Sequence, residues 1–231
     1  MSARAPETIN HNIATIQGEI SKLAAQAQMD TVPSPTLIAV SKRQPEARIE
    51  DALAAGQRVF GENKVQEAET HWAARRGNWA DLELHLIGPL QTNKVNKAMA
   101  LFDVIQTVDR TKLADKIKTA ADREGRCPRL FIQVNTGAEP QKAGVPVEHL
   151  ADLVNHIRAL DLPLEGLMCI PPADDDAALH FALLKKLAKR YGLSGLSMGM
   201  SSDYALASVM GATHIRVGTA LFGPREDQDS P

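Results

Sequence analysis

The chain has 231 residues, of which 44% are hydrophobic and 23% are charged, and its formal net charge is -2. This composition supplies a sizeable core and contains no strongly basic block, which excludes a protein built to bind nucleic acid or a membrane surface. Aromatic residues make up only 4%, which also argues against platforms for base stacking.

The amino terminus and the cysteines indicate a cytoplasmic protein. Residues 1–7 are polar and lack the apolar core of a signal peptide, and no stretch is long and apolar enough to span a bilayer. Cys127 and Cys169 lie far apart in the sequence, so we expect free thiols in a reducing compartment, although the sequence alone leaves a disulfide open.

An amphipathic helix is predicted within residues 1–30, where Thr8 can cap its start. Its apolar residues recur at alternating spacings of three and four and form one stripe, so the helix must lie on another part of the molecule. Pro33 and Pro35 then end it, because proline is incompatible with a helix interior. The stripe consists of Ile9, Ile13, Ile16, Ile20 and Leu23.

Short apolar segments alternate with helical segments along the rest of the chain. Glycines such as Gly56 and Gly125 close the helical segments, and no hairpin signal joins two strands. Alternation of this kind is typical of parallel strands joined by crossover helices. The predicted strands are 36–42, 58–63, 82–88, 103–108, 130–135, 164–170, 195–200 and 214–219. The predicted helices are 45–55, 64–76, from 93, 110–124, 147–160, from after 172 to 190, and 202–210.

Eight such repeats predict an α/β fold, a (β/α)8 TIM barrel that forms a single domain over residues 1–231. An open doubly wound sheet is the alternative, but no Gly-x-Gly-x-x-Gly fingerprint follows the first strand. Only a polar tail, 224–231, follows the last repeat, which lacks a full helix. We expect the amino-terminal helix to cover part of that gap.

Lys42 ends the first buried strand, at the face of the barrel where chemistry collects. Desolvation disfavours the charged ammonium, so a lysine held there can lose its proton near neutral pH and attack a carbonyl. A solvated lysine at a strand end is the alternative.

An anion seat is predicted after the last two strands, where this architecture commonly binds phosphate. Met200 and Ser201 open a helix whose first amide groups are unpaired, and Gly218 and Thr219 allow close backbone approach and add a hydroxyl donor. An ordinary serine-capped helix is the alternative.

A phosphate seat, a lysine across the mouth and Arg216 between them fit pyridoxal 5'-phosphate (PLP). An arginine cannot give up its proton, so a ring nitrogen beside Arg216 would stay unprotonated and make a weak electron sink. Transamination-type chemistry is therefore disfavoured, whereas simple binding or racemisation stays open.

Other polar residues are weaker candidates. The seven histidines show no zinc spacing, and Asp174, Asp175 and Asp176 are expected to be solvated charges at a helix start, so no metal site is predicted. His85 lies in a predicted strand and fits a hydrogen-bonded core histidine better than a catalytic one. We interpret Glu62 and Glu67 as carboxylates at the start of a helix rather than as catalytic acids.

Six motifs in order resemble the pyridoxal phosphate homeostasis proteins, the YggS/PROSC family. The resemblance extends from about residue 36 to residue 223. The motifs are AVSK (39–42), FGENKVQE (60–67), HLIGPLQTNK (85–94), GLMCIPP (166–172), SMGMSSD (197–203) and IRVGTALFG (215–223).

The resemblance implies one barrel like the amino-terminal domain of alanine racemase, with PLP bound as a Schiff base to Lys42. It implies phosphate donors from Ser201, Gly218 and Thr219, Arg216 near the ring nitrogen, and Asn63 beside the cofactor. Family members are regarded as carriers or regulators of the PLP pool without established turnover, so PLP-dependent apo-enzymes are candidate partners, and we expect a monomer.

Two alternatives stay open: a low-activity PLP-dependent amino acid racemase, and a phosphate-ligand sensor without a Schiff base. Racemisation needs an acid–base group on each face of the substrate carbon, and Lys42 supplies one. The alanine racemase tyrosine comes from a second domain that is not found here, and Tyr191 and Tyr204 lie in or after predicted helices. Carriage of PLP is therefore favoured over racemisation.

Overall fold

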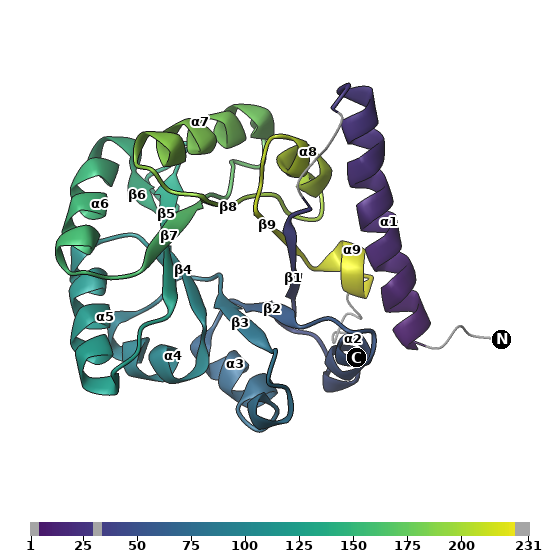
Figure 1. The fold of residues 1–231 in the computed structure, drawn as a ribbon, viewed down its shortest axis with the longest axis horizontal. Coiled ribbons are helices and arrows are strands. Elements are labelled where there is room, and N and C mark those ends of the chain that lie inside the picture. The colour runs from purple at the N-terminus through teal and green to yellow at the C-terminus, as the bar shows by residue number, and fades with distance from the viewer. Residues whose placement is uncertain (1–4, 30–33, 225–231) are drawn as a thin grey trace.

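The computed structural model describes residues 5–29 and 34–224, and its centre is a closed barrel of parallel strands (Figure 1). Eight strands form the ring: β1 Thr36–Val40, β2 Val59–Glu62, β3 Glu83–Leu86, β4 Val104–Val108, β5 Arg129–Asn135, β7 Leu164–Met168, β8 Gly195–Ser197 and β9 His214–Val217. Each strand pairs with the next in this order, and β9 pairs with β1 to close the ring. The predicted (β/α)8 barrel is confirmed.

Helices follow the strands and surround the barrel (Figure 1). In α5, Thr111–Glu124, the buried residues Leu113, Ala114, Ile117 and Ala120 lie on one helical face. None of the helices within residues 5–29 and 34–224 is long and apolar enough to cross a membrane. The other helices that follow strands are α2 Glu46–Ala54, α3 Val65–Trp72, α4 Val95–Leu101, α6 Leu150–Ala159, α7 Ala177–Arg190, α8 Tyr204–Val209 and α9 Thr219–Phe222.

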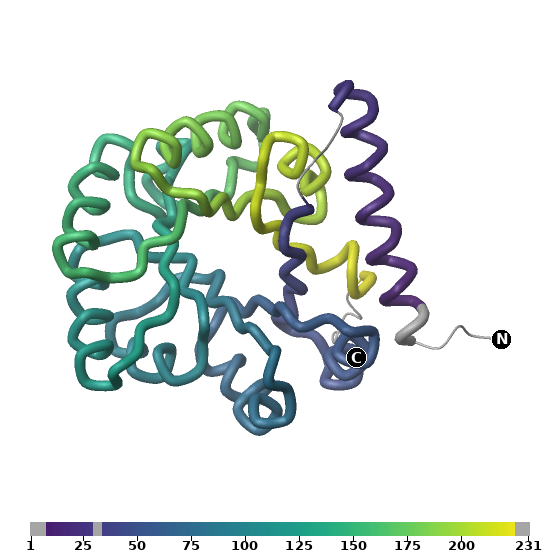
Figure 2. Tube along the Cα trace, viewed as in Figure 1, coloured from purple at the N-terminus to yellow at the C-terminus, as the bar shows by residue number. Residues whose placement is uncertain are grey.

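The amino-terminal helix, α1 Ala5–Gln26, packs against α2, α8 and α9, outside the junction of β1 and β9 (Figure 2). Ile9 and Ile16 of its apolar stripe are buried. Because α9 has a single turn, α1 covers the side left open after the last strand, as predicted. The helix begins before Thr8, which is therefore not its cap. Parts of three predicted features lie outside the described residues. They are the start of the helix (1–4), the break after it (30–33) and most of the tail (225–231).

Several predicted boundaries are wrong by a few residues. β8 ends at Ser197 rather than at residue 200, because Gly199, with φ of 93°, turns the chain tightly against α8. A Cβ at Gly199 would lie 2.5 Å from the Cβ of Ala207. β9 ends at Val217, and α3 ends at Trp72 before a 3-10 turn at Arg76–Asn78.

Several short elements were not predicted, among them the single-turn helix α9. The two-residue strand β6, Val145–Pro146, pairs with the end of β5 inside a loop rich in glycine and proline. Two further 3-10 turns, Thr92–Lys94 and Val147–His149, lead into α4 and α6.

Candidate functional site

A cavity of about 320 Å³ opens at the carboxyl ends of the strands. Its walls come from the loops after β2, β1, β9 and β8, which are consecutive around the ring, and from neighbouring apolar residues. All seven predicted binding residues lie in its lining. The lining consists of Val40, Lys42, Gln44, Asn63, Ile87, Ile170, Met200, Ser201, Ser202, Arg216, Gly218 and Thr219.

Lys42 follows the buried end of β1 and lies, partly exposed, in the wall of the cavity. The loop that carries it is held on both sides. The Ser41 amide donates to the Gly61 carbonyl at 3.1 Å, the Gln44 amide donates to the Ser41 carbonyl at 3.0 Å, and Arg43 adopts a left-handed φ of 57°. Its partial exposure lies between the desolvated lysine and the solvated lysine that the sequence left open.

Arg216 is only 4% exposed and lies between the barrel interior and the cavity. Its Nη1 donates to Ser197 Oγ at 2.7 Å, and its Nη2 donates to the Cys169 carbonyl at 2.8 Å. Burial lowers the pKa of Arg216, but an arginine still remains protonated at neutral pH. The guanidinium is therefore a fixed positive charge in the cavity wall.

A polar chain inside the barrel continues from Arg216. Ser197 Oγ donates to Gln106 Oε1 at 2.6 Å, and Gln106 Nε2 lies 2.8 Å from His85 Nδ1. Because the amide nitrogen can only donate, Nδ1 accepts, and the His85 proton lies on Nε2, which is 2.5 Å from Glu83. This bond lowers the pKa of Glu83 to about 2. His85 is thus a hydrogen-bonded core residue, as predicted.

Three residues of the predicted anion seat, Ser201, Gly218 and Thr219, lie together in the wall of the cavity. The amides of Gly218 and Ala220 point at Ser201 Oγ at 3.4 and 3.5 Å, which is long for a hydrogen bond, so they are weakly engaged. The expectation for Met200 is wrong in one respect. Its amide is not unpaired but donates to Asp203 at 2.5 Å, because α8 begins only at Tyr204.

Asn63 follows β2 and reaches the cavity because the neighbouring loop makes room for it. A Cβ at Gly88 would lie 2.2 Å from the Asn63 carbonyl oxygen, so only glycine permits this approach. The Gly88 carbonyl in turn accepts a hydrogen bond from Thr107 Oγ1 at 2.8 Å.

Comparison with known proteins identifies relatives over nearly the whole chain. The family model for the alanine racemase N-terminal domain matches residues 7–226. A pyridoxal phosphate homeostasis protein of Pseudomonas aeruginosa is 41% identical, covering 95% of this chain and 96% of that protein. A pyridoxal phosphate homeostasis protein of Pasteurella multocida is 38% identical, and the match covers 95% of this chain and 98% of that protein. The chain belongs to the pyridoxal phosphate homeostasis protein family.

Solved structures include PipY of Synechococcus elongatus, which is 42% identical to this chain. The alignment with the PipY structure without PLP has a TM-score of 0.78 and covers 88% of this chain and 99% of the PipY chain. The alignment with the PLP-bound structure has a TM-score of 0.74 and covers 89% of this chain and 100% of the PipY chain. The resemblance inferred from the motifs is therefore confirmed.

Five lining residues were not among the predicted binding residues: Val40, Gln44, Ile87, Ile170 and Ser202. Gln44 lies in the same loop as Lys42, so its position in the chain was a usable signal. Ile87 follows β3, and its apolar side chain carried no chemical signal of its own.

One earlier interpretation is wrong. Glu62 is not a helix-start carboxylate but the last residue of β2, and it is completely buried. It accepts a hydrogen bond from Ser41, the residue before Lys42, at 2.7 Å. Glu67 does lie in the first turn of α3, as predicted.

The remaining candidates have structural roles. Asp176 caps α7 by accepting a hydrogen bond from the Ala178 amide, and Asp175 bonds to His180. Cys127 and Cys169 are free thiols, as expected, and burial raises the pKa of Cys169 to about 12.

Proposed function

We propose that this chain binds PLP in the cavity, holds it covalently through Lys42, and takes part in homeostasis of the intracellular PLP pool. The observation that carries the proposal is the convergence of one amine, one buried guanidinium and a group of hydroxyl and amide donors in a single cavity. PLP requires this donor set, because it carries an aldehyde, a ring nitrogen and a phosphate. The PLP-bound structure of the relative PipY adds support.

Each residue has a distinct task in this proposal. Lys42 Nζ would condense with the aldehyde, whose oxygen leaves as water, and Ser201, Gly218 and Thr219 would bind the phosphate. Arg216 donates to the ring nitrogen, and Asn63 and Met200 lie beside the ring. When bound, PLP supplies an electron sink, but Arg216 keeps its own proton and so leaves the ring nitrogen unprotonated, which weakens that sink.

Carriage without turnover is better supported than amino acid racemisation. The hydroxyl of Tyr204 donates to Glu19 of α1, and burial raises the pKa of this tyrosine above its ordinary value. Tyr191 lies at the end of α7. Neither tyrosine is among the cavity-lining residues, so neither is placed to act as the second base.

The wider role rests on the family. The relatives from Pseudomonas aeruginosa and Pasteurella multocida are named for PLP homeostasis rather than for a reaction. For this chain we propose a cytoplasmic monomer that passes PLP to apo-enzymes.

Absorption spectroscopy of the purified chain titrated with PLP tests the binding proposal. We expect a visible band that borohydride removes, its loss in Lys42→Ala, and its retention in Lys94→Ala, a lysine of a neighbouring cavity. PLP binding without the band in the unaltered chain would support the phosphate-ligand sensor instead.

Chiral chromatography after incubation with L- or D-alanine tests the racemase alternative. Carriage predicts no interconversion above the PLP-only control. Turnover at about 1 per second or faster, which is ordinary for enzymes, would contradict it.

A further inference from the structure

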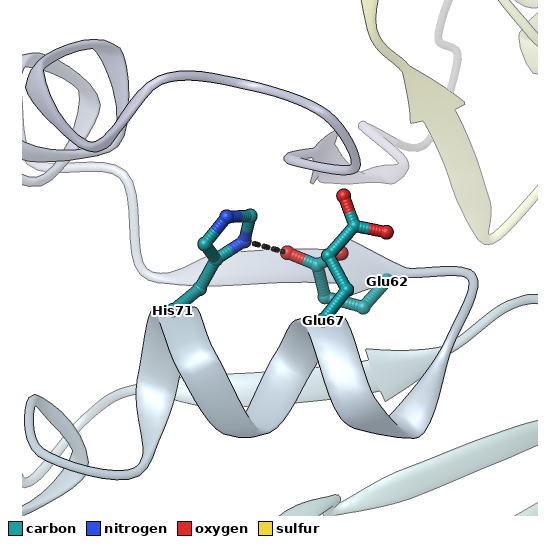
Figure 3. A group of neighbouring side chains, drawn as sticks. All are labelled: Glu62, Glu67 and His71. Carbon is teal, nitrogen blue, oxygen red and sulfur yellow. Dashed lines mark hydrogen bonds and ion pairs between the residues drawn. The ribbon is translucent and has the colours of Figure 1, made fainter.

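Behind the loop that carries Lys42, β2 and α3 bring two carboxylates and an imidazole together. Glu62 ends β2, and Glu67 and His71 lie one turn apart on α3 (Figure 3). One possible ligand atom from each of the three lies within 4.8 Å of the other two. Glu62 and His71 are buried, whereas Glu67 lies at the edge of the cluster.

The two oxygens of the Glu62 carboxylate differ, because Oε1 has three polar neighbours whereas Oε2 has no partner in the described part of the chain. Oε1 is 2.7 Å from Ser41 Oγ, 2.9 Å from His71 Nδ1 and 3.1 Å from Trp72 Nε1. Oε2 is buried and has no hydrogen-bond partner within residues 5–29 and 34–224, and the residue is 0% exposed. A buried carboxylate oxygen without a donor is unfavourable unless a water molecule or a cation satisfies it.

Arginine side chains on neighbouring segments do not fill this role. Arg75 follows α3, and its guanidinium donates to Glu50 at 2.5 Å and to the His71 carbonyl at 2.6 Å. Arg43 contributes its backbone amide, which donates to Glu67 Oε1.

We propose that Glu62, Glu67 and His71 form a binding site for a divalent transition-metal cation of the zinc class. One imidazole and two carboxylates suit such a cation, whereas Mg²⁺ and Ca²⁺ prefer oxygen ligands alone. Three protein ligands leave one position of a tetrahedral shell for water. The cation would satisfy Glu62 Oε2 and offset the charge of both carboxylates.

The hydrogen bonds around the cluster suit ligands of a metal. Ser41 and Trp72 hold Glu62 Oε1, and the Arg43 amide holds Glu67 Oε1. Outer donors of this kind orient carboxylate ligands at metal sites. Because Ser41 and Arg43 flank Lys42, a bound cation would also fix the loop that carries this lysine.

Binding requires a small rearrangement. Ligand atoms around a tetrahedral Zn²⁺ lie roughly 3.4 Å apart, given metal–ligand distances of about 2.1 Å. The cation would take Glu62 Oε2 and replace the 2.9 Å hydrogen bond between Glu62 Oε1 and His71 Nδ1, and the partly exposed Glu67 would turn toward both residues. The proton on His71 Nδ1 leaves to solvent or moves to Nε2 when the metal takes its place.

The expectation of no metal site rested on the absence of a zinc motif in the sequence. Two ligands have the Glu-x-x-x-His spacing of one helical turn, but the third comes from a different element. Only the packing of α3 on β2 brings it to them.

Isothermal titration of the chelator-treated full chain with ZnCl₂, and in parallel with MgCl₂, tests the proposal. The variants are Glu67→Gln and His71→Gln, and the matched control is Glu69→Gln, which lies on the same helix and whose carboxylate pairs with Lys97 of α4. We expect one Zn²⁺ per chain, affinity at least tenfold lower in both variants, unchanged affinity in the control, and weaker Mg²⁺ binding. The absence of stoichiometric binding, or equal affinity in wild type and variants, would overturn the proposal.

Two further readouts separate loss of the site from loss of the fold. Zn²⁺ should raise the melting temperature of the wild type and of Glu69→Gln, but not of the two ligand variants, whose circular dichroism should match the wild type. The wild-type chain loaded with Co²⁺ should show the intense d–d absorption of a four-coordinate site. Its absence would overturn the proposal even if the variants did not fold.

Discussion

Ser201 is the point at which the donors of the proposed phosphate seat converge. The amides of Gly218 and Ala220 point at its hydroxyl from the following loop. An anion placed here would accept hydrogen bonds from both amides and from the hydroxyl, without a lysine.

Ser201→Ala should therefore weaken binding of PLP but not of pyridoxal, which lacks the phosphate. A hydrogen bond to a charged group contributes about 1.5–3 kcal/mol, so we expect a dissociation constant for PLP roughly 10- to 150-fold higher. Equilibrium titration with each ligand measures the difference. Equal weakening for both ligands would mean that Ser201 does not contact the phosphate.

His214 should make the protein less stable in mild acid. Burial is the main cause that lowers its pKa from 6.5 to about 4. The unfolded chain therefore binds this proton first as the pH falls, so stability is full above about pH 6.5 and declines towards pH 4. The full shift corresponds to about 3 kcal/mol.

The prediction for His214 is tested by urea unfolding of the wild type and His214→Gln at a series of pH values. The difference between the two curves should change between pH 6.5 and pH 4. Glu83, whose pKa is lowered to about 2, gives its own loss of stability at lower pH, and this loss is common to both proteins. Parallel curves across the upper range would refute the assignment to His214.

At the scale of elements, the approach of the loop after β3 to the loop after β2 depends on Gly88. The Cβ of Gly88→Ala would meet the Asn63 carbonyl oxygen at 2.2 Å, and this backbone contact cannot be relieved by a side-chain rotation.

We expect Gly88→Ala to lower the free energy of unfolding by about 1–3 kcal/mol and to displace Asn63 from the cavity. Unfolding curves and PLP titration measure both effects. Gly77→Ala, where a Cβ meets nothing within 4 Å, is the matched control. If Gly88→Ala matched this control in both measurements, the close approach would not be needed.

The elements were predictable to the extent that their signals are local. Buried strands such as β1 and β5 are short apolar runs, and the stripe of α1 is visible in the spacing of its isoleucines. The early end of β8 could not be predicted, because it depends on the turn at Gly199, which contacts α8. The start of α8 at Tyr204 was missed for a similar reason, since the Asp203 side chain takes up the Met200 amide.

At the scale of the whole molecule, the order of the strands decided most of the site. β1 lies between β2 and β9, and β8 lies beyond β9, so the residues after these strands had to meet at one mouth. Barrel closure could be inferred from eight repeats, and the seven predicted cavity residues followed from it. The burial of Glu62 could not be inferred, because it depends on α3 packing over β2 at the position of this one side chain.

The central claim is that Lys42 forms the covalent bond to PLP at the barrel mouth. Peptide mass spectrometry of the full chain, incubated with PLP and reduced with borohydride, tests it most directly. We predict a single reduced adduct on Lys42, and none on Lys64, Lys94 or Lys142, which line neighbouring cavities. An adduct on one of those lysines with Lys42 unmodified would contradict the account.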